Sequence, residues 1–146
     1  ASFNDPVFQS FLAKTSAVAE PIEQALNMKL INGGNQDPEN NQAYTIFRMQ
    51  VKNPGEYAAA YSKLTKAQED AGNTAGSYGL RQLVGGDTRY YTHYAYTSAA
   101  SVGDAMASAE VMYSSDSFAE FANEISENRR LMNISILVNV VNYNTN

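Results

Sequence analysis

The chain contains no cysteine, no tryptophan and a single histidine among its 146 residues. Without cysteine, disulfide bonds, thiolate zinc sites and cysteine nucleophiles are excluded, and one histidine cannot build a histidine triad for a metal. Basic side chains are also few: ten Lys and Arg against fifteen Asp and Glu give a net charge of -5. Nucleic-acid partners are therefore not expected, because binding to a phosphate backbone needs clustered cations.

Long apolar segments are absent as well. No run approaches the roughly 18 residues that a membrane-spanning helix requires, so no membrane span is expected. The chain begins at Ala1 rather than Met and is rich in polar and aromatic residues, with 15 Asn and 10 Tyr. These features predict an exported bacterial protein, secreted or periplasmic, whose signal peptide has been removed. A proteolytic fragment or a trimmed chain would begin in the same way.

The residues from about 44 to 143 predict one domain with the element order strand-helix-strand-strand-helix-strand. A first strand is expected over 44–51, and both of its faces carry apolar side chains, one of them together with Arg48. Asn53-Pro54-Gly55-Glu56 then supplies a helix cap, a proline in the first turn and a glutamate at the third helical position. The mixed second face of the strand predicts a sheet with helices on one side and an enclosed space on the other.

A hairpin and a broken helix complete this domain. Strands are expected over 77–84 and 88–97, joined by a glycine-rich turn. Two helical pieces follow, because the segment is interrupted by polar residues, and the second piece is expected over about 118–131 with Ser117 as its cap. The β-branched segment 133–143 is long enough for a central strand.

The first 35 residues predict an additional helix-strand unit. A helix is expected over about 6–20, and a short strand over 26–31 follows a change of direction at Pro21. The unit is similar to the end of the chain: Phe8, Phe11, Ser16, Leu26, Met28, Leu30 and Ile31 recur 110 positions later as Phe118, Phe121, Ser126, Ile136, Val138, Val140 and Val141. Two unrelated amphipathic helix-strand units would share such a pattern, so duplication and chance both remain open.

Three segments are therefore expected: a helix-strand extension over 1–35, a linker over 36–43 and a ferredoxin-like α+β domain over 44–146. The element order, the Asn53-Pro54-Gly55-Glu56 helix start, the Thr92-His93-Tyr94 segment and the β-branched last strand resemble the dimeric α+β-barrel superfamily. That superfamily includes antibiotic-biosynthesis-monooxygenase-like and stress-responsive barrel proteins. The resemblance implies that two such sheets pair into a barrel, in a homodimer or higher oligomer.

Five side chains are candidate ligand contacts: His93, Tyr91, Arg89, Arg48 and Arg81. Alternation along the strand places His93 on one face with Arg89 and Tyr91. The resemblance implies a general base or haem ligand for His93, and a packed, hydrogen-bonded imidazole is the alternative. The three arginines lie on three expected strands, and they either converge on a carboxylate or phosphate or form separate salt bridges at the barrel rim.

Two functions are consistent with these features. The first is an exported, oligomeric barrel protein that binds a small molecule in the barrel interior and is monooxygenase-like, with its ligand and any cofactor unidentified. The second is an assembly subunit that adds its N-terminal helix-strand unit to a neighbouring sheet edge, as donated strands do. The same unit folded back on its own sheet would instead cover an edge. No metal site is expected, and the residues do not decide whether the protein is an enzyme.

Overall fold

The computed structural model describes residues 4–19 and 25–140, and the turn expected at Pro21 lies outside them. Five strands form one antiparallel sheet of order β1-β3-β4-β2-β5. The strands are β1 (Leu26–Gly34), β2 (Ala43–Val51), β3 (Ser77–Gly85), β4 (His93–Ala99) and β5 (Arg129–Val138). The helices are α1 (Pro6–Ser16), α2 (Pro54–Asp70), α3 (Val102–Tyr113) and α4 (Asp116–Glu124), with a short 3-10 helix η1 (Pro38–Asn40). From β2 to β5 the order is β-α-β-β-α-β with the second helix broken, which confirms the ferredoxin-like α+β fold.

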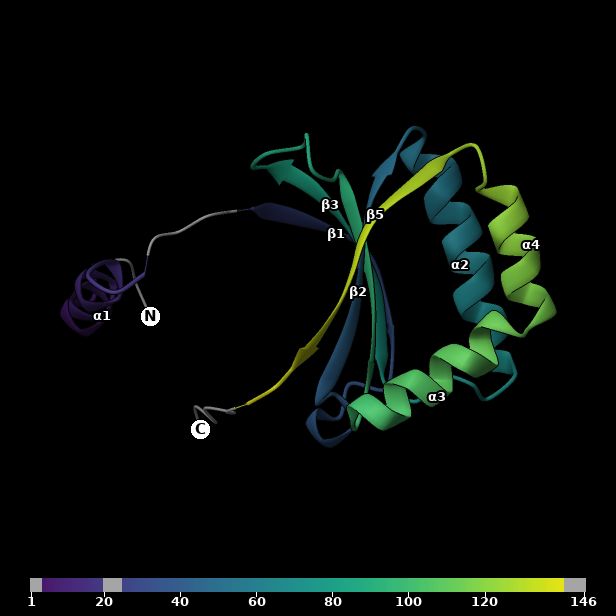
Figure 1. Cartoon of the computed structure of the whole chain (residues 1–146), viewed down its shortest axis with the longest axis horizontal. Helices are drawn as coiled ribbons and strands as arrows, with labels where there is room; N and C mark the ends of the chain where they lie inside the picture. The colour runs from purple at the N-terminus through teal and green to yellow at the C-terminus, as the bar shows by residue number, and fades with distance from the viewer. Residues whose placement is uncertain (1–3, 20–24, 141–146) are drawn as a thin grey trace.

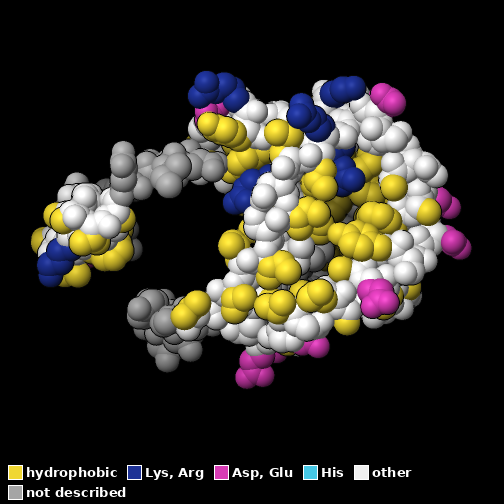
Figure 2. Space-filling model, viewed as in Figure 1, with side chains coloured by type: hydrophobic (Ala, Val, Ile, Leu, Met, Phe, Trp, Pro, Cys, Tyr) yellow, Lys and Arg dark blue, Asp and Glu magenta, His cyan; other side chains and the backbone are white. Residues whose placement is uncertain are grey.

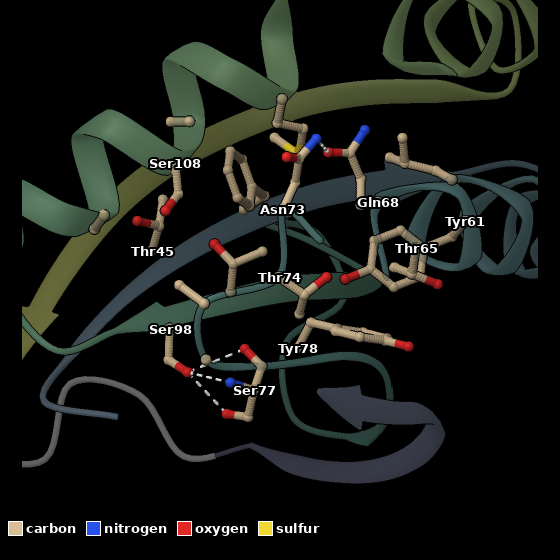
Figure 3. A pocket seen from close by; sticks show the side chains of 18 residues that line it. Thr45, Tyr61, Thr65, Gln68, Asn73, Thr74, Ser77, Tyr78, Ser98 and Ser108 are labelled. Atoms are coloured by element: carbon tan, nitrogen blue, oxygen red, sulfur yellow. Dashed lines mark hydrogen bonds between the residues drawn. The ribbon is translucent and has the colours of Figure 1, made fainter. Parts of the chain in front are cut away.

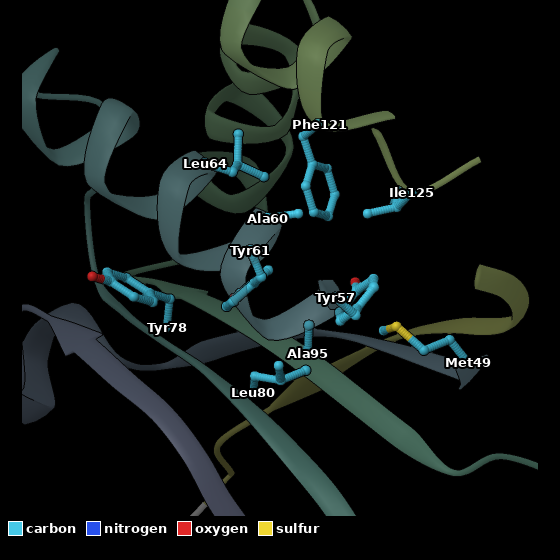
Figure 4. Close-up of a cluster of buried hydrophobic side chains, with 10 residues drawn as sticks. All are labelled: Met49, Tyr57, Ala60, Tyr61, Leu64, Tyr78, Leu80, Ala95, Phe121 and Ile125. Atoms are coloured by element: carbon cyan, nitrogen blue, oxygen red, sulfur yellow. The ribbon is translucent and has the colours of Figure 1, made fainter. Parts of the chain in front are cut away.

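The helices α2, α3 and α4 cover one face of the sheet and leave the other face open (Figure 1). Cross-strand partners share a face, so Phe47, Ala95 and Leu80 all point towards the helices. The buried core lies between these strands and the helices α2 and α4 (Figure 4). Phe121 of α4 meets the rings of Tyr57 and Tyr61 of α2 edge-on, with centroids 5.9 and 6.4 Å apart.

Local capping sets the helix starts. The side chain of Asn53 accepts a hydrogen bond from the Glu56 amide at the start of α2. Ser115, and not Ser117, caps α4 by accepting from the Phe118 amide at 3.3 Å. The helix expected over 118–131 was therefore wrong at both ends, because α4 starts at Asp116 and ends at Glu124.

The last strand lies at an edge of the sheet and not at its centre. β5 pairs with β2 along its whole length, and among the described strands β2 is its only neighbour. The central places belong to β4 and β2, as the ferredoxin-like order requires. Six apolar side chains of β5 are consequently 39 to 55% exposed: Leu131, Met132, Ile134, Ile136, Leu137 and Val138.

The opposite edge is covered by β1, which pairs antiparallel with β3 from Leu26 opposite Gly85 to Gly34 opposite Ser77. The two strands lie close together at Gly33, where a Cβ atom would overlap the Tyr78 ring. The next residue, Gly34, has a φ of 77°, a backbone conformation that favours glycine. The extra strand thus lies on its own sheet in this structure. By contrast, α1 stands apart from the sheet and contains no buried residue (Figure 1).

Charge is distributed unevenly between the sheet and the rest of the protein. The five strands contain no Asp or Glu, yet they carry half of the ten basic residues: Lys29, Arg48, Arg81, Arg129 and Arg130. Within residues 4–19 and 25–140, every acidic residue lies outside the strands. In the described part of the chain, no helix combines the length and apolar character needed to cross a membrane.

Candidate functional site

A cleft of about 270 Å³ lies between the sheet and the helix layer. Figure 2 shows hydrophobic side chains gathered around a hollow between β5 and the helices. Six of the side chains that line the cleft are aromatic, and most of the others are apolar. The lining residues are Phe47, Tyr57, Tyr61, Leu64, Ala95, Thr97, Met112, Tyr113, Phe118, Phe121, Arg129, Leu131 and Ile134. An apolar, aromatic cleft of this kind suits a flat organic molecule.

Arg129 is the only charged residue among those that line this cleft. Its guanidinium lies over the ring of Phe121, and its positive charge acts on the pKa of the Tyr57 hydroxyl. Three ion pairs occur among the described residues, and Arg129 takes part in none of them. Since guanidinium groups bind carboxylates and phosphates in a bidentate manner, Arg129 gives the apolar cleft a place for one anionic group.

Two phenols lie close to this cation. Burial raises the pKa of the Tyr57 hydroxyl, and the charge of Arg129 acts in the opposite direction. The pKa of Tyr113 is raised by burial as well, again against the effect of Arg129. Both hydroxyls therefore stay protonated near neutral pH and can act as hydrogen-bond donors to a bound molecule.

A smaller cavity of about 80 Å³ adjoins the cleft between α2, α3 and the sheet (Figure 3). The two spaces share five lining residues: Phe47, Tyr61, Leu64, Thr97 and Met112. Some of its polar groups already have partners within the protein: 2.9 Å separates the hydroxyl oxygens of Ser77 and Ser98, and Gln68 Nε2 donates at 2.7 Å to Ser117 Oγ, outside the cavity lining. We therefore assign these polar groups a structural role, and the cleft beside Arg129 is the stronger candidate site.

His93 is buried, with 1% of its surface exposed. It lies opposite Met49 and Gln82 on the face that the helices cover. Its Nδ1 atom is 2.9 Å from Thr92 Oγ1, and Nε2 has no hydrogen-bond partner. Burial lowers the pKa of the imidazole, so His93 is neutral at pH 7. Neither the cleft nor the smaller cavity is lined by His93.

The residues around the cleft do not fit a histidine-ligated haem. Haem iron is held by an axial side chain, most often a histidine, and His93 is the only histidine of the chain. Because His93 does not reach the cleft, its expected role as a haem ligand finds no support in this geometry. No group of three or more His, Asp or Glu side chains suited to a metal ion occurs among residues 4–19 and 25–140.

Arg48 and Arg81 lie on the open face, on either side of Tyr94 in one cross-strand row. Each guanidinium is drawn towards a different edge of the sheet. Arg48 donates to Asn133 Oδ1 on β5 at 3.3 Å, whereas Arg81 donates to the Ile31 carbonyl on β1 at 2.8 Å. The structure therefore brings the two arginines to one face but does not bring their charged groups together.

Arg89 lies outside the strands, because β4 begins at His93 and residues 88–90 form a turn. Its guanidinium pairs with the Asp87 carboxylate at 2.6 Å. The alternation that grouped Arg89 with His93 was wrong, since it assumed a strand from residue 88. Tyr91 is buried beside Arg48, whose guanidinium carbon is 5.5 Å from the ring centroid.

Sequence reasoning missed the cleft and its cation. The pair Arg129-Arg130 is also compatible with cations at a helix C-terminus, where they would complement the helix dipole. In the structure the two residues open β5, with Arg130 on the open face opposite Gln50 and Arg129 on the helix side opposite Val51. No local sequence pattern distinguishes Arg129 from Arg130, because the face on which each side chain lies follows from the register between β5 and β2.

No protein-family model matches the chain, and no curated protein matches it in sequence. Its fold does match solved structures. A provisionally assigned monooxygenase from Fusobacterium nucleatum subsp. nucleatum ATCC 25586 superposes with a TM-score of 0.54 and 11% identity, over 93% of this chain and 64% of that one. A haem-degrading enzyme from Listeria monocytogenes gives a TM-score of 0.51 and 11% identity, over 90% of this chain and 93% of that one.

A provisionally assigned monooxygenase from Lactobacillus acidophilus NCFM gives a TM-score of 0.50 and 10% identity, over 73% of this chain. The chain spans only 46% of the Lactobacillus protein and 64% of the Fusobacterium protein. At such identities the likeness shows the fold alone. The expected fold-level resemblance is thus confirmed: this chain has the α+β fold that these monooxygenase-like and haem-degrading proteins share.

Proposed function

We propose that the protein binds a small aromatic or apolar molecule with one anionic group, and that it does so in the cleft beside Arg129. The observation that carries this proposal is a single cation in an otherwise uncharged, aromatic wall. The ring system of the ligand would pack among Tyr57, Tyr113 and Phe118, and its anion would meet the guanidinium. The volume of about 270 Å³ is close to the lower end, roughly 300 Å³, of small-molecule pockets, so the ligand is small.

This site differs from the barrel interior that the sequence suggests. The cleft lies within one chain, on the helix-covered face, whereas a barrel interior would be formed by the open face. A monooxygenase-like reaction of the bound molecule is a further part of the proposal. Its support is the fold shared with monooxygenase-like proteins, together with the Tyr57 and Tyr113 hydroxyls beside the expected anion.

Two fluorescent probes test the binding proposal. Anilinonaphthalene sulfonate has an aromatic body and an anion, and N-phenyl-1-naphthylamine has the same body without the charge. We expect Arg129→Gln to weaken binding of the sulfonate by about tenfold, the loss of roughly one charge-assisted contact, and to leave binding of the neutral probe unchanged. Arg130→Gln is the matched control, because Arg130 lies on the opposite face of the same strand. An equal effect of both substitutions, or none for Arg129→Gln, would overturn the proposal.

Export and self-association are proposals as well. The composition, rich in Asn and Tyr, supports a secreted or periplasmic location. The open face carries half-buried Tyr44, Ile46 and Tyr96, and aromatic side chains are common at subunit interfaces. Light scattering over a dilution series tests self-association. A constant mass near twice 15.9 kDa would support a homodimer, larger species would favour an assembly subunit, and 15.9 kDa throughout would contradict both.

A further inference from the structure

A row of four side chains runs across the helix-covered face of the sheet and brings hydroxyl groups next to the cleft. Cross-strand pairing places these residues side by side in the order Tyr78, Thr97, Thr45 and Ile136. The next row along the strands, which contains Phe47, is entirely apolar. Because partners in one row share a face and lie about 5 Å apart, Thr45 and Thr97 form a pair of neighbouring hydroxyl side chains.

These two hydroxyls, together with that of Ser108 on α3, line the smaller cavity (Figure 3). All three side chains are half-buried, and none of them forms a hydrogen bond to another described residue. The hydroxyl of Thr65, which lines the same cavity, is by contrast bonded within α2 and donates to the Ser62 carbonyl at 3.1 Å. A half-buried hydroxyl without a protein partner gains from a hydrogen bond to whatever fills the space beside it. Thr45, Thr97 and Ser108 are therefore available to a bound molecule.

The charge of the cavity lining decides which chemical group fits there. None of the residues that line the smaller cavity is Lys, Arg, His, Asp or Glu. A charged group would lose its hydration in this space without gaining a counterion, so the cavity favours a neutral group. Hydroxyl side chains both donate and accept hydrogen bonds, and they suit an alcohol, a phenol or a carbonyl group. Thr97 lines both the cavity and the cleft, so this group and the anion beside Arg129 can belong to one molecule.

The strand register shows how the two ends of the combined space are separated. Arg129 lines only the cleft, and Thr45 lines only the smaller cavity. Arg129 lies opposite Val51 on β2, and Val51 is six residues from Thr45, about 20 Å along a strand. A molecule that contacts both ends is therefore elongated, with its anion and its neutral polar group at opposite ends of an aromatic body.

We propose that the smaller cavity is a second subsite of the cleft, which binds a neutral hydrogen-bonding group at the end of the ligand remote from its anion. Thr45, Thr97 and Ser108 exchange hydrogen bonds with this group. The ligand class is thereby narrowed to elongated aromatic anions that carry a hydroxyl or carbonyl group at the far end. This inference rests on the proposed function, because the anion at Arg129 orients the molecule in the cleft.

Two rigid probes that differ by one hydroxyl group test this subsite. Biphenyl-4-carboxylate supplies the anion and the aromatic body, and 4′-hydroxybiphenyl-4-carboxylate adds a hydroxyl at the opposite end. In titration calorimetry we expect the hydroxylated probe to bind about fivefold more tightly, the effect of roughly one net hydrogen bond. The double variant Thr45→Val/Thr97→Val should remove this preference and leave the affinity for the plain carboxylate nearly unchanged. Thr65→Val is the matched control, because the Thr65 hydroxyl is already bonded to Ser62.

The outcomes separate this inference from the proposed function. If both probes bind equally and Arg129→Gln weakens each of them, the cavity holds only water, and the subsite is refuted while the cleft is not. If neither probe binds, the cleft and the subsite are both refuted. A preference that persists in the double variant, or that Thr65→Val also removes, refutes the subsite. If circular dichroism shows that the double variant is unfolded, Thr45→Val and Ser108→Ala are measured singly, and each should reduce the preference.

Discussion

The guanidinium carbon of Arg129 lies 5.8 Å from the centre of the Phe121 ring. Phe121 belongs to α4 and Arg129 to β5, so this contact joins the helix layer to the edge strand at the cleft. A cation over an aromatic face is stabilised by about 0.5 to 2 kcal/mol, depending on its exposure to water. The contact therefore holds the cation in place before a ligand arrives, which lowers the entropic cost of binding.

Phe121→Ala should lower the free energy of unfolding by about 3 to 5 kcal/mol, the usual cost of truncating a buried aromatic residue. Phe121 is 5% exposed and meets Tyr57 and Tyr61, so the cavity left behind cannot close easily. Phe11→Ala is the matched control at the repeated position, and we expect it to cost less than about 0.5 kcal/mol, as exposed sites do. Urea denaturation measures both values. A large loss for Phe11→Ala would show that α1 is packed in solution.

His93 should make the protein less stable in weak acid. Burial lowers its pKa below the usual 6.5, so the unfolded chain takes up this proton at a higher pH than the folded chain does. The stability that comes from keeping His93 neutral is therefore present above pH 6.5 and is lost as the pH falls from 6.5 towards the lower pKa of the folded state. Urea denaturation at a series of pH values from about 8 to 5 covers the upper part of this range.

The control for this prediction is His93→Gln, which keeps a polar side chain but does not titrate. Its stability should change less with pH over the same interval than that of the wild-type protein. If the two profiles run parallel, the acid sensitivity comes from other groups and the burial of His93 has no consequence for titration.

Arg81→Lys should loosen β1 from the sheet. The Arg81 guanidinium donates to the Ile31 carbonyl at 2.8 Å and to Asn32 Oδ1 at 3.0 Å, and an ammonium group cannot reproduce this forked arrangement. We expect the amides of β1 to exchange with deuterium about tenfold faster, equivalent to one lost hydrogen bond of about 1.4 kcal/mol. Arg48→Lys is the control on the same face. Equal acceleration in both variants would mean that Arg81 does not hold β1 in particular.

Much of the fold could be predicted from the sequence, because it depends on contacts between near neighbours. The cap at Asn53 involves an amide three residues away, and the break between α3 and α4 follows from the polar residues around Ser115. The order of the elements needed only the alternation of apolar patterns with turn residues. The caps, the helix break and the order of the elements do not depend on how the strands pair in the sheet.

The site could not be predicted in the same way, because it depends on register. His93 and Arg48 are both strand residues with the right chemistry, yet the pairing of β2 with β4 puts Met49 opposite His93 and so turns Arg48 to the other face. The start of β4 at His93 depends on the Thr92 amide, which donates to the Met49 carbonyl at 2.9 Å, a contact 43 residues apart in sequence. Arg129 lines the cleft for the same reason: the long-range pairing of β5 with β2 places it opposite Val51, on the helix side of the sheet.

Half of the basic residues lie in the strands and no described acidic residue does, so the sheet is positively charged while the rest of the described chain carries an excess of acidic residues. Its net charge of -5 predicts repulsion from anionic surfaces at long range. Within a Debye length, about 10 Å in 0.1 M salt, the field of the sheet would dominate instead and turn the basic face towards such a surface. The protein would then adsorb in one orientation, with its acidic helix layer pointing outward, and salt would release it.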